Sequence, residues 1–153
     1  KIMQRLKLTT LVTMEYKKQE AMRLCPQIPT LPKDSDQACK YRGYTIPANA
    51  MVVTSPIHTP YNAEYWDDPQ SCGPLRFSEE RKEHKRNAYS WIPFSGGAHM
   101  CIGLHFAEMQ IKLVMFEMVK NYRWRVPVDY KMPVQQSPIS KPTDGLPVTL
   151  RRR

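Results

Sequence analysis

The stretch WIPFSGGAHMCIG, residues 91–103, places a single cysteine, Cys101, among glycines and directly ahead of a long helical pattern. Glycines at 96, 97 and 103 allow the backbone to adopt positive φ and to approach a flat ligand closely. Because amide dipoles point toward the start of a helix, they stabilise a thiolate at Cys101. The stretch therefore indicates a metal ligand, and a structural cysteine buried in a glycine turn is the alternative.

The chemistry around this cysteine favours haem over zinc. A tetrahedral zinc site needs three further ligands, and nothing near Cys101 supplies them at the usual spacing. Haem iron needs only one axial ligand from the protein. His99 is a candidate donor to an anionic group such as a haem propionate, and Phe94 is a candidate for packing against a ring face or the thiolate.

Hydrophobic periodicity predicts two helices. Apolar residues recur at helical spacing over about 8–24, until the proline-rich stretch CPQIPTLP stops the helix. A second apolar stripe runs from Gly103 to Tyr122 and predicts a buried helix; its members are Leu104, Ala107, Ile111, Val114, Met115 and Met118.

The remaining segments predict short strands and coil. Two strands within about 38–54 flank a turn at Arg42–Gly43, and proline-containing edge strands follow over 125–153. Residues 59–93 are predicted to be ordered coil with one helical turn near 62–66, and so long a coil is usually functional. The predicted class is mainly α with small β-sheets.

Composition limits the choice of partners and compartment. The chain has 153 residues, 41% hydrophobic residues and a formal charge of +9, so it is globular and basic. A nucleic-acid-binding signature is absent from the sequence, and we expect no nucleic-acid partner. Four cysteines without metal-finger spacing predict a reduced, cytoplasmic protein. The sequence starts within a helical pattern, which suggests a piece of a longer chain and leaves an upstream membrane anchor open.

The pattern F-x-x-G-x-x-x-C-x-G is met in full by Phe94, Gly97, Cys101 and Gly103, and Ala107 fits its continuation. This loop resembles the haem-binding loop of the cytochrome P450 family. The resemblance implies haem b held by the Cys101 thiolate, with a small residue at Ala107 that lets the helix lie close to the haem plane. The implied fold is the C-terminal, haem-binding third of the family's single large domain.

A second motif resembles the same family. Glu20 and Arg23 stand at i and i+3 as in its E-x-x-R helix, and PLRF at 74–77 resembles its P-E-R-F stretch. The resemblance implies a buried triad of Glu20, Arg23 and Arg76, whereas the first two alone would be an exposed helix pair. Leu75 replaces the usual acidic residue beside Arg76, and Ser95 stands where glycine is common.

The resemblance implies a monooxygenase that inserts one oxygen atom from O2 into a hydrophobic substrate such as a sterol, terpenoid or fatty acid. Short strings look most like the sterol 14-demethylase branch, in which Lys33 would meet a haem propionate; a simple turn lysine is the alternative. The family's oxygen-activating helix lies upstream of E-x-x-R, so no catalytic residue is assignable here. An isomerase, a peroxygenase and a truncated non-catalytic haem-binding piece remain as alternatives.

The basic run RKEHKR, residues 81–86, shortly precedes the cysteine loop. In the family, the cysteine-side face commonly receives an acidic redox partner, a ferredoxin or a reductase. The resemblance therefore implies a docking role for this run, and an ordinary solvated charge run is the alternative.

Overall fold

The computed structural model describes the backbone of residues 2–153 and the side chains from Val12 onward, so the apolar side chains at positions 8 and 11 lie outside the described residues. The elements in chain order are α1 (Ile2–Leu24), β1 (Leu31–Ser35), β2 (Cys39–Tyr41), β3 (Tyr44–Ile46), β4 (Ala50–Thr54), the 3-10 turns η1 (Thr59–Tyr61), η2 (Pro74–Phe77), η3 (Glu83–Lys85) and η4 (Gly97–His99), then α2 (Leu104–Asn121), β5 (Tyr122–Arg125), β6 (Val134–Gln135), β7 (Lys141–Pro142) and β8 (Thr149–Arg152).

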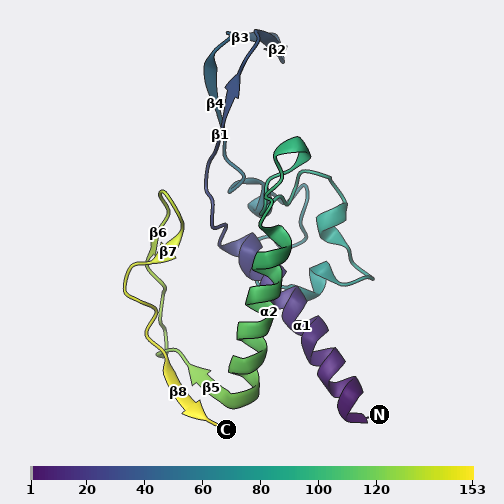
Figure 1. The fold of residues 1–153 in the computed structure, drawn as a ribbon, viewed down its shortest axis with the longest axis vertical. Helices are drawn as coiled ribbons and strands as arrows, with labels where there is room; N and C mark the ends of the chain where they lie inside the picture. Colours follow the sequence, from purple (N-terminus) through teal and green to yellow (C-terminus); the bar gives the residue numbers. More distant parts are fainter. Residues whose placement is uncertain (1) are drawn as a thin grey trace.

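The two helices cross at the centre of the molecule, and the other elements lie around them (Figure 1). The strand pairs β1–β4 and β2–β3 form an arm at one end, and the sheet β5–β8 lies at the other end of α2. The coil of residues 59–93 packs on α1 through η1 and η2. The predicted class, mainly α with small β-sheets, is confirmed.

Helix α1 begins earlier than predicted, at Ile2 instead of about residue 8, and ends at Leu24 as predicted. The Cys25 amide still donates to the Ala21 carbonyl before Pro26 stops the helical pattern. The Tyr61 hydroxyl, from η1, donates to the Leu24 carbonyl and so satisfies an acceptor left open at the helix end.

The predicted hairpin is confirmed, but the arm contains one more strand pair than the sequence predicted. Strands β2 and β3 pair around Arg42 and Gly43, both at positive φ. Strand β4 does not extend this hairpin; it pairs antiparallel with β1, so that Pro32 lies opposite Val53. The prediction missed β1 because Pro32 and two charged residues give it the composition of a turn, which an edge strand tolerates.

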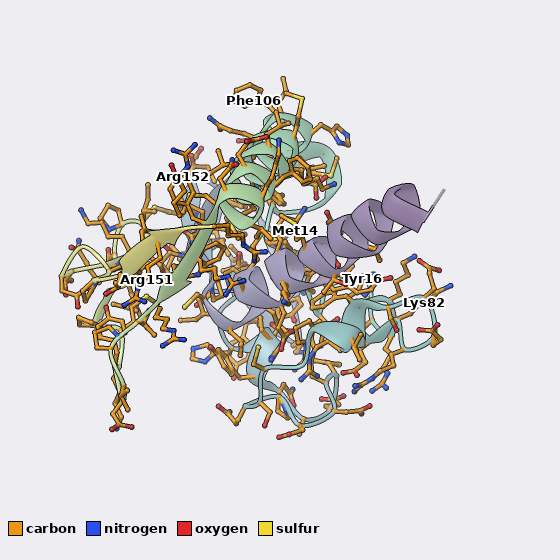
Figure 2. The ribbon with its side chains drawn as sticks, turned by 90° about the horizontal axis from the view of Figure 1, so that it is seen from below. Met14, Tyr16, Lys82, Phe106, Arg151 and Arg152 are labelled. Carbon is orange, nitrogen blue, oxygen red and sulfur yellow. The ribbon has the colours of Figure 1, made fainter. Side chains whose placement is uncertain are left out.

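The prediction that α2 is buried is wrong for the described residues. No side chain of α2 is fully buried, and Leu113 and Phe106 are more than half exposed. Figure 2 shows Phe106 at the outer edge of α2, away from α1. The predicted stripe is partly shielded because Ile111 and Met115 line a cavity between the helices, whereas Val114 is 58% exposed.

The coil of 59–93 is ordered around a core that is mostly polar. Trp66 and Phe77 are the buried aromatic side chains among the described residues, and their ring centroids lie 5.7 Å apart. The predicted turn near 62–66 is present, since the Trp66 amide donates to the Asn62 carbonyl. The buried polar residues of the described part of the chain are Lys18, Glu20, Arg23, Arg76, Ser78, Glu83 and Ser90.

The C-terminal strands follow α2 directly, three residues before the predicted start at 125. Strand β5 pairs antiparallel with β8, and β6 pairs with β7. Trp124 in β5 reaches the wall of the cavity between the helices. The segment thus closes one end of the cavity that the cysteine loop borders.

Candidate functional site

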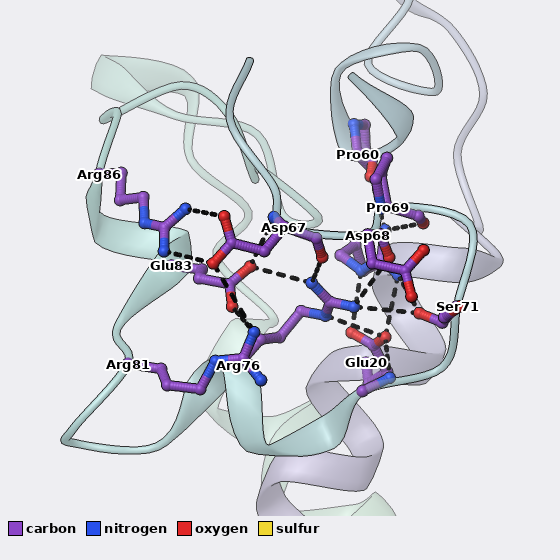
Figure 3. Close-up of polar contacts among 12 residues, drawn as sticks. Glu20, Pro60, Asp67, Asp68, Pro69, Ser71, Arg76, Arg81, Glu83 and Arg86 are labelled. Carbon is purple, nitrogen blue, oxygen red and sulfur yellow. Dashed lines mark hydrogen bonds and ion pairs between the residues drawn. The ribbon is translucent and has the colours of Figure 1, made fainter. Parts of the chain in front are cut away.

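The structure brings Glu20, Arg23 and Arg76 together in the interior (Figure 3). The Arg23 guanidinium binds both carboxylate oxygens of Glu20 at 2.9 Å, and the Arg76 Nε donates to Glu20 Oε1 at 3.2 Å. These three side chains are 0 to 2% exposed. The alternative of an exposed helix pair is therefore excluded by the burial.

The two guanidinium groups also hold the coil of residues 59–93 in place through hydrogen bonds to its carbonyls. Arg23 donates to the carbonyls of Pro60 at 2.6 Å and Pro69 at 2.8 Å. Both arginines donate to the Ser71 carbonyl, at 3.2 Å from Arg23 and 3.0 Å from Arg76. Because a coil lacks its own ladder of hydrogen bonds, these side-chain donors determine its path.

A fourth buried charge, Glu83, completes the cluster and was not predicted. Its carboxylate is 0% exposed, accepts from Arg76 Nη1 at 2.9 Å and accepts from the Asp67 amide at 3.1 Å. The cluster therefore holds two carboxylates against two guanidiniums. Leu75, which stands where an acidic residue is usual, is exposed and offers Arg76 no carboxylate. Glu83 supplies Arg76 with its second carboxylate instead.

Glu20 stays ionised in this interior. Burial raises the pKa of its carboxyl, but hydrogen bonds from Arg23 and from the Gly73 amide, together with the charges of both arginines, outweigh burial and hold the pKa below the ordinary 4.5. A Cβ at Gly73 would lie 2.9 Å from Arg76 Nη2, so a larger residue there would force the Arg76 guanidinium to shift.

The cysteine loop is a tight turn leading into α2. The Cys101 amide donates to the Phe94 carbonyl at 2.9 Å, and the Leu104 amide at the start of α2 donates to the Cys101 carbonyl at 3.3 Å. Gly97 has φ of +70°, as its glycine predicts, whereas Gly96 is extended. Ser95 also lies in the left-handed region, with φ of +63°.

Cys101 lies on the wall of a cavity of about 1000 Å³ between α1, α2 and the cysteine loop. Phe94, His99 and Ala107 line the same cavity, so the structure brings together most of the residues predicted to surround a ligand. Further apolar lining comes from Met14, Ala21, Met22, Ile28, Leu31, Trp91, Ile92, Ile111, Met115, Val119 and Trp124. The cavity is thus a mostly apolar space with two thiols, those of Cys101 and Cys25, on its wall.

Lys33 is not brought to this cavity. It is exposed in β1, where it pairs in register with Val52, and it is absent from the cavity wall. Gly97 and Gly103 shape the loop without lining the cavity. A Cβ at Gly103 would lie 3.7 Å from the Cys101 sulfur, so glycine keeps the space beside the sulfur open.

The basic run 81–86 is mostly engaged in local ion pairs. Lys82 lies 2.8 Å from Glu79, and Arg86 lies 2.7 Å from Asp67. Arg81 pairs with Glu83. Lys85 forms no ion pair with the described side chains, so much of the run's positive charge is compensated within its own surface.

The possible metal ligands, the cysteines and the helices of the described residues limit the site further. No group of three or more His, Cys, Asp or Glu side chains that could hold a metal ion is present between Val12 and Arg153. The four cysteines are free thiols. Among the helices as far as they are described, none is both long and apolar enough to cross a membrane.

Comparison with known proteins gives one consistent result. The sequence profile of the family "Cytochrome P450" matches residues 3–150. The chain is 32% identical over 147 residues to "Putative cytochrome P450 136" of Mycobacterium tuberculosis, covering 95% of this chain and 30% of that protein. It is 31% identical over 125 residues to "Tabersonine 16-hydroxylase 2" of Catharanthus roseus, covering 79% of this chain and 24% of the relative.

Solved structures show the same fold. A retinoic acid-bound cyanobacterial CYP120A1 superposes with a TM-score of 0.82 at 24% identity, covering 92% of this chain and 32% of the other. The haem domain of cytochrome P450DA superposes with a TM-score of 0.78 at 26% identity, covering 88% and 30%. The chain thus spans about a third of the length of the proteins it matches.

Proposed function

Because the chain belongs to the cytochrome P450 family, we propose that it is the haem-binding part of a haem-thiolate monooxygenase with Cys101 as the iron ligand. The proposed reaction inserts one oxygen atom from O2 into a hydrophobic organic substrate. The observation that carries the proposal is the position of Cys101, which lies on the wall of a cavity of about 1000 Å³ with apolar lining.

The residues present fit haem b. Cys101 is the one thiol in the cysteine loop, and no described cluster offers the several ligands that zinc requires. Haem iron needs a single protein ligand, and haem is a large, mostly apolar disc. The cavity volume and mostly apolar lining suit such a group, and Gly103 adds no side chain beside the sulfur.

Each residue of the loop has a defined task in this proposal. Cys101 holds the iron, while its amide bond to Phe94 fixes the turn in which the sulfur is presented. His99, exposed on the cavity wall, donates to a propionate, and Ala107 leaves room for the ring beside α2. The bound haem supplies the activation of O2, and the apolar lining keeps water away from the sulfur.

The substrate and partners are also part of the proposal. Ile28 and Leu31 line the cavity, which supports an apolar substrate of the sterol, terpenoid or fatty acid class. The sterol 14-demethylase-like branch remains a prediction. An acidic ferredoxin or reductase is proposed as the electron donor, with Lys85 as the cation of run 81–86 that local ion pairs leave available among the described residues.

The experiment is an absorbance spectrum of the reduced, carbon-monoxide-bound full-length protein. A red-shifted Soret band reports thiolate ligation, and we expect Cys101→Ala to abolish it. Cys25→Ala is the matched control, because Cys25 is the second thiol on the same cavity wall. Retention of the band in Cys101→Ala, or its loss in Cys25→Ala, would show that the ligand is assigned wrongly.

A further inference from the structure

Four alternating charges join α1 to α2 where the helices cross. Lys18 Nζ lies 2.8 Å from Glu15 Oε1 and 2.9 Å from Glu108 Oε1. Lys112 Nζ lies 2.9 Å from Glu15 Oε2. Each helix contributes one lysine and one glutamate, so this interhelical network is neutral and crosses the helix interface twice.

Lys18 is the centre of the interhelical network. Its side chain is 7% exposed, whereas Glu15 and Glu108 are about a quarter exposed and Lys112 is about half exposed. A lysine removed from water in this way depends on its carboxylate partners, since loss of one partner leaves a buried charge without compensation. Surface pairs such as Lys82 with Glu79 carry no such penalty.

The interhelical network lies between the buried cluster around Glu20 and the cysteine loop. On α1, Lys18 stands two residues before Glu20. On α2, Glu108 directly follows Ala107. The Ala107 amide donates to the carbonyl of Gly103 at 2.9 Å, and Gly103 lies two residues after Cys101. The ion pairs of Lys18 and Lys112 with carboxylates of the facing helix therefore fix α2 relative to α1 in this part of the chain.

We propose that Lys18 is a positioning residue: through Glu108 it holds the first turns of α2 against α1 and so sets where the Cys101 sulfur stands on the cavity wall. Lys18 and Lys112 line the cavity that Cys101 borders, so a shift of α2 would change the cavity as well as the turn. The functional consequence, thiolate ligation of iron, rests on the proposed function.

The test compares Lys18→Met with Lys18→Arg, which keeps the charge, and with Lys82→Met as a surface control. In the full-length protein we measure the fraction of haem with the red-shifted Soret band. We also measure amide hydrogen exchange at Cys101, whose amide bonds to Phe94, and at Gly73, whose amide bonds to Glu20. Exchange can be followed without haem, so it tests position independently.

We expect Lys18→Met to lower the thiolate-ligated fraction and to speed exchange at Cys101 about five-fold, with little change at Gly73. Lys18→Arg should recover both signals, and Lys82→Met should change neither. A Lys18→Met protein that is less stable to urea but has unchanged Cys101 exchange and Soret fraction would reduce the network to a structural ion pair and overturn the proposal.

The outcomes separate this proposal from the proposed function. If the unsubstituted protein has no red-shifted band, the proposed function fails, and exchange at Cys101 still decides whether Lys18 positions the turn. If the band is present and only Cys101→Ala removes it, haem-thiolate ligation stands while Lys18 has no positioning role.

Discussion

Replacing Arg76 with methionine tests the polar core most directly. Arg76 is 2% exposed and uses all five of its donors: Nε to Glu20, Nη1 to Glu83 and to the Asp67 carbonyl, and Nη2 to the carbonyls of Asp68 and Ser71. Methionine replaces the aliphatic stem of arginine but lacks the guanidinium and all of its donors. Glu83 would then be a buried carboxylate whose remaining cationic partner, Arg81, is 44% exposed.

The expected loss follows from that geometry. Breaking a buried ion pair by removal of one partner costs about 3–5 kcal/mol. Whole domains are stable by only about 5–15 kcal/mol, so the change should remove a large part of the free energy of unfolding. The matched control is Arg81→Met, which also contacts Glu83 but from the surface, and we expect it to cost about 0–1 kcal/mol.

The assay is urea unfolding of the full-length protein, followed by circular dichroism and by tryptophan fluorescence, because Trp66 lies 5.9 Å from the Arg76 guanidinium. If Arg76→Met does not fold, Arg76→Lys retains the charge without the planar fork and should lose about 1–3 kcal/mol. A free energy of unfolding for Arg76→Met within about 1 kcal/mol of that for Arg81→Met would refute the reasoning, since an exposed pair has that magnitude.

Two further changes test the surroundings of this core. Gly73→Ala should destabilise the protein by about 1–3 kcal/mol in the same assay, because the added Cβ meets Arg76 Nη2; an unchanged urea midpoint would contradict this. Burial lowers the pKa of His84 in the folded protein below 6.5. As the pH falls, the unfolded chain therefore binds a proton at His84 before the folded protein does. The free energy of unfolding should decrease as the pH drops from 6.5 toward the lowered pKa. His84→Phe, which preserves packing on Phe77 and Trp91, should flatten this part of the pH profile and leave the separate loss below pH 4.5, where Glu20 titrates.

The features predicted well from sequence are those with local causes. The C-terminal end of α1, both ends of α2, the hairpin turn at Arg42 and Gly43, and the turn at Cys101 depend on prolines, glycines and periodicity within a few residues. Even Ser95, which departs from the glycine pattern, occupies the left-handed conformation at which glycine would be expected.

The features that sequence reasoning missed depend on residues far apart in the chain. Strand β1 is defined by its pairing with β4, and nothing in LPKDS itself indicates a strand. Glu83 looks like part of a solvated run, and its signal is only that it is the lone acid among the basic residues of 81–86. Lys18 finds Glu108 across 90 positions, a separation at which charge patterns along one helix carry no information.

The hydrogen bonds from Arg23 into the coil have a consequence for a growing polypeptide. Arg23 is synthesised 37 residues before Pro60 and 48 residues before Ser71, whose carbonyls it will finally bind. Because chains fold from the N-terminus as they emerge, the Arg23 guanidinium has neither of these acceptors until the later residues are synthesised. Glu20, one helical turn away, can neutralise it at once. Helix α1 thus contains its own counter-ion for Arg23 during synthesis, and the loop of residues 59–93 later encloses the pair.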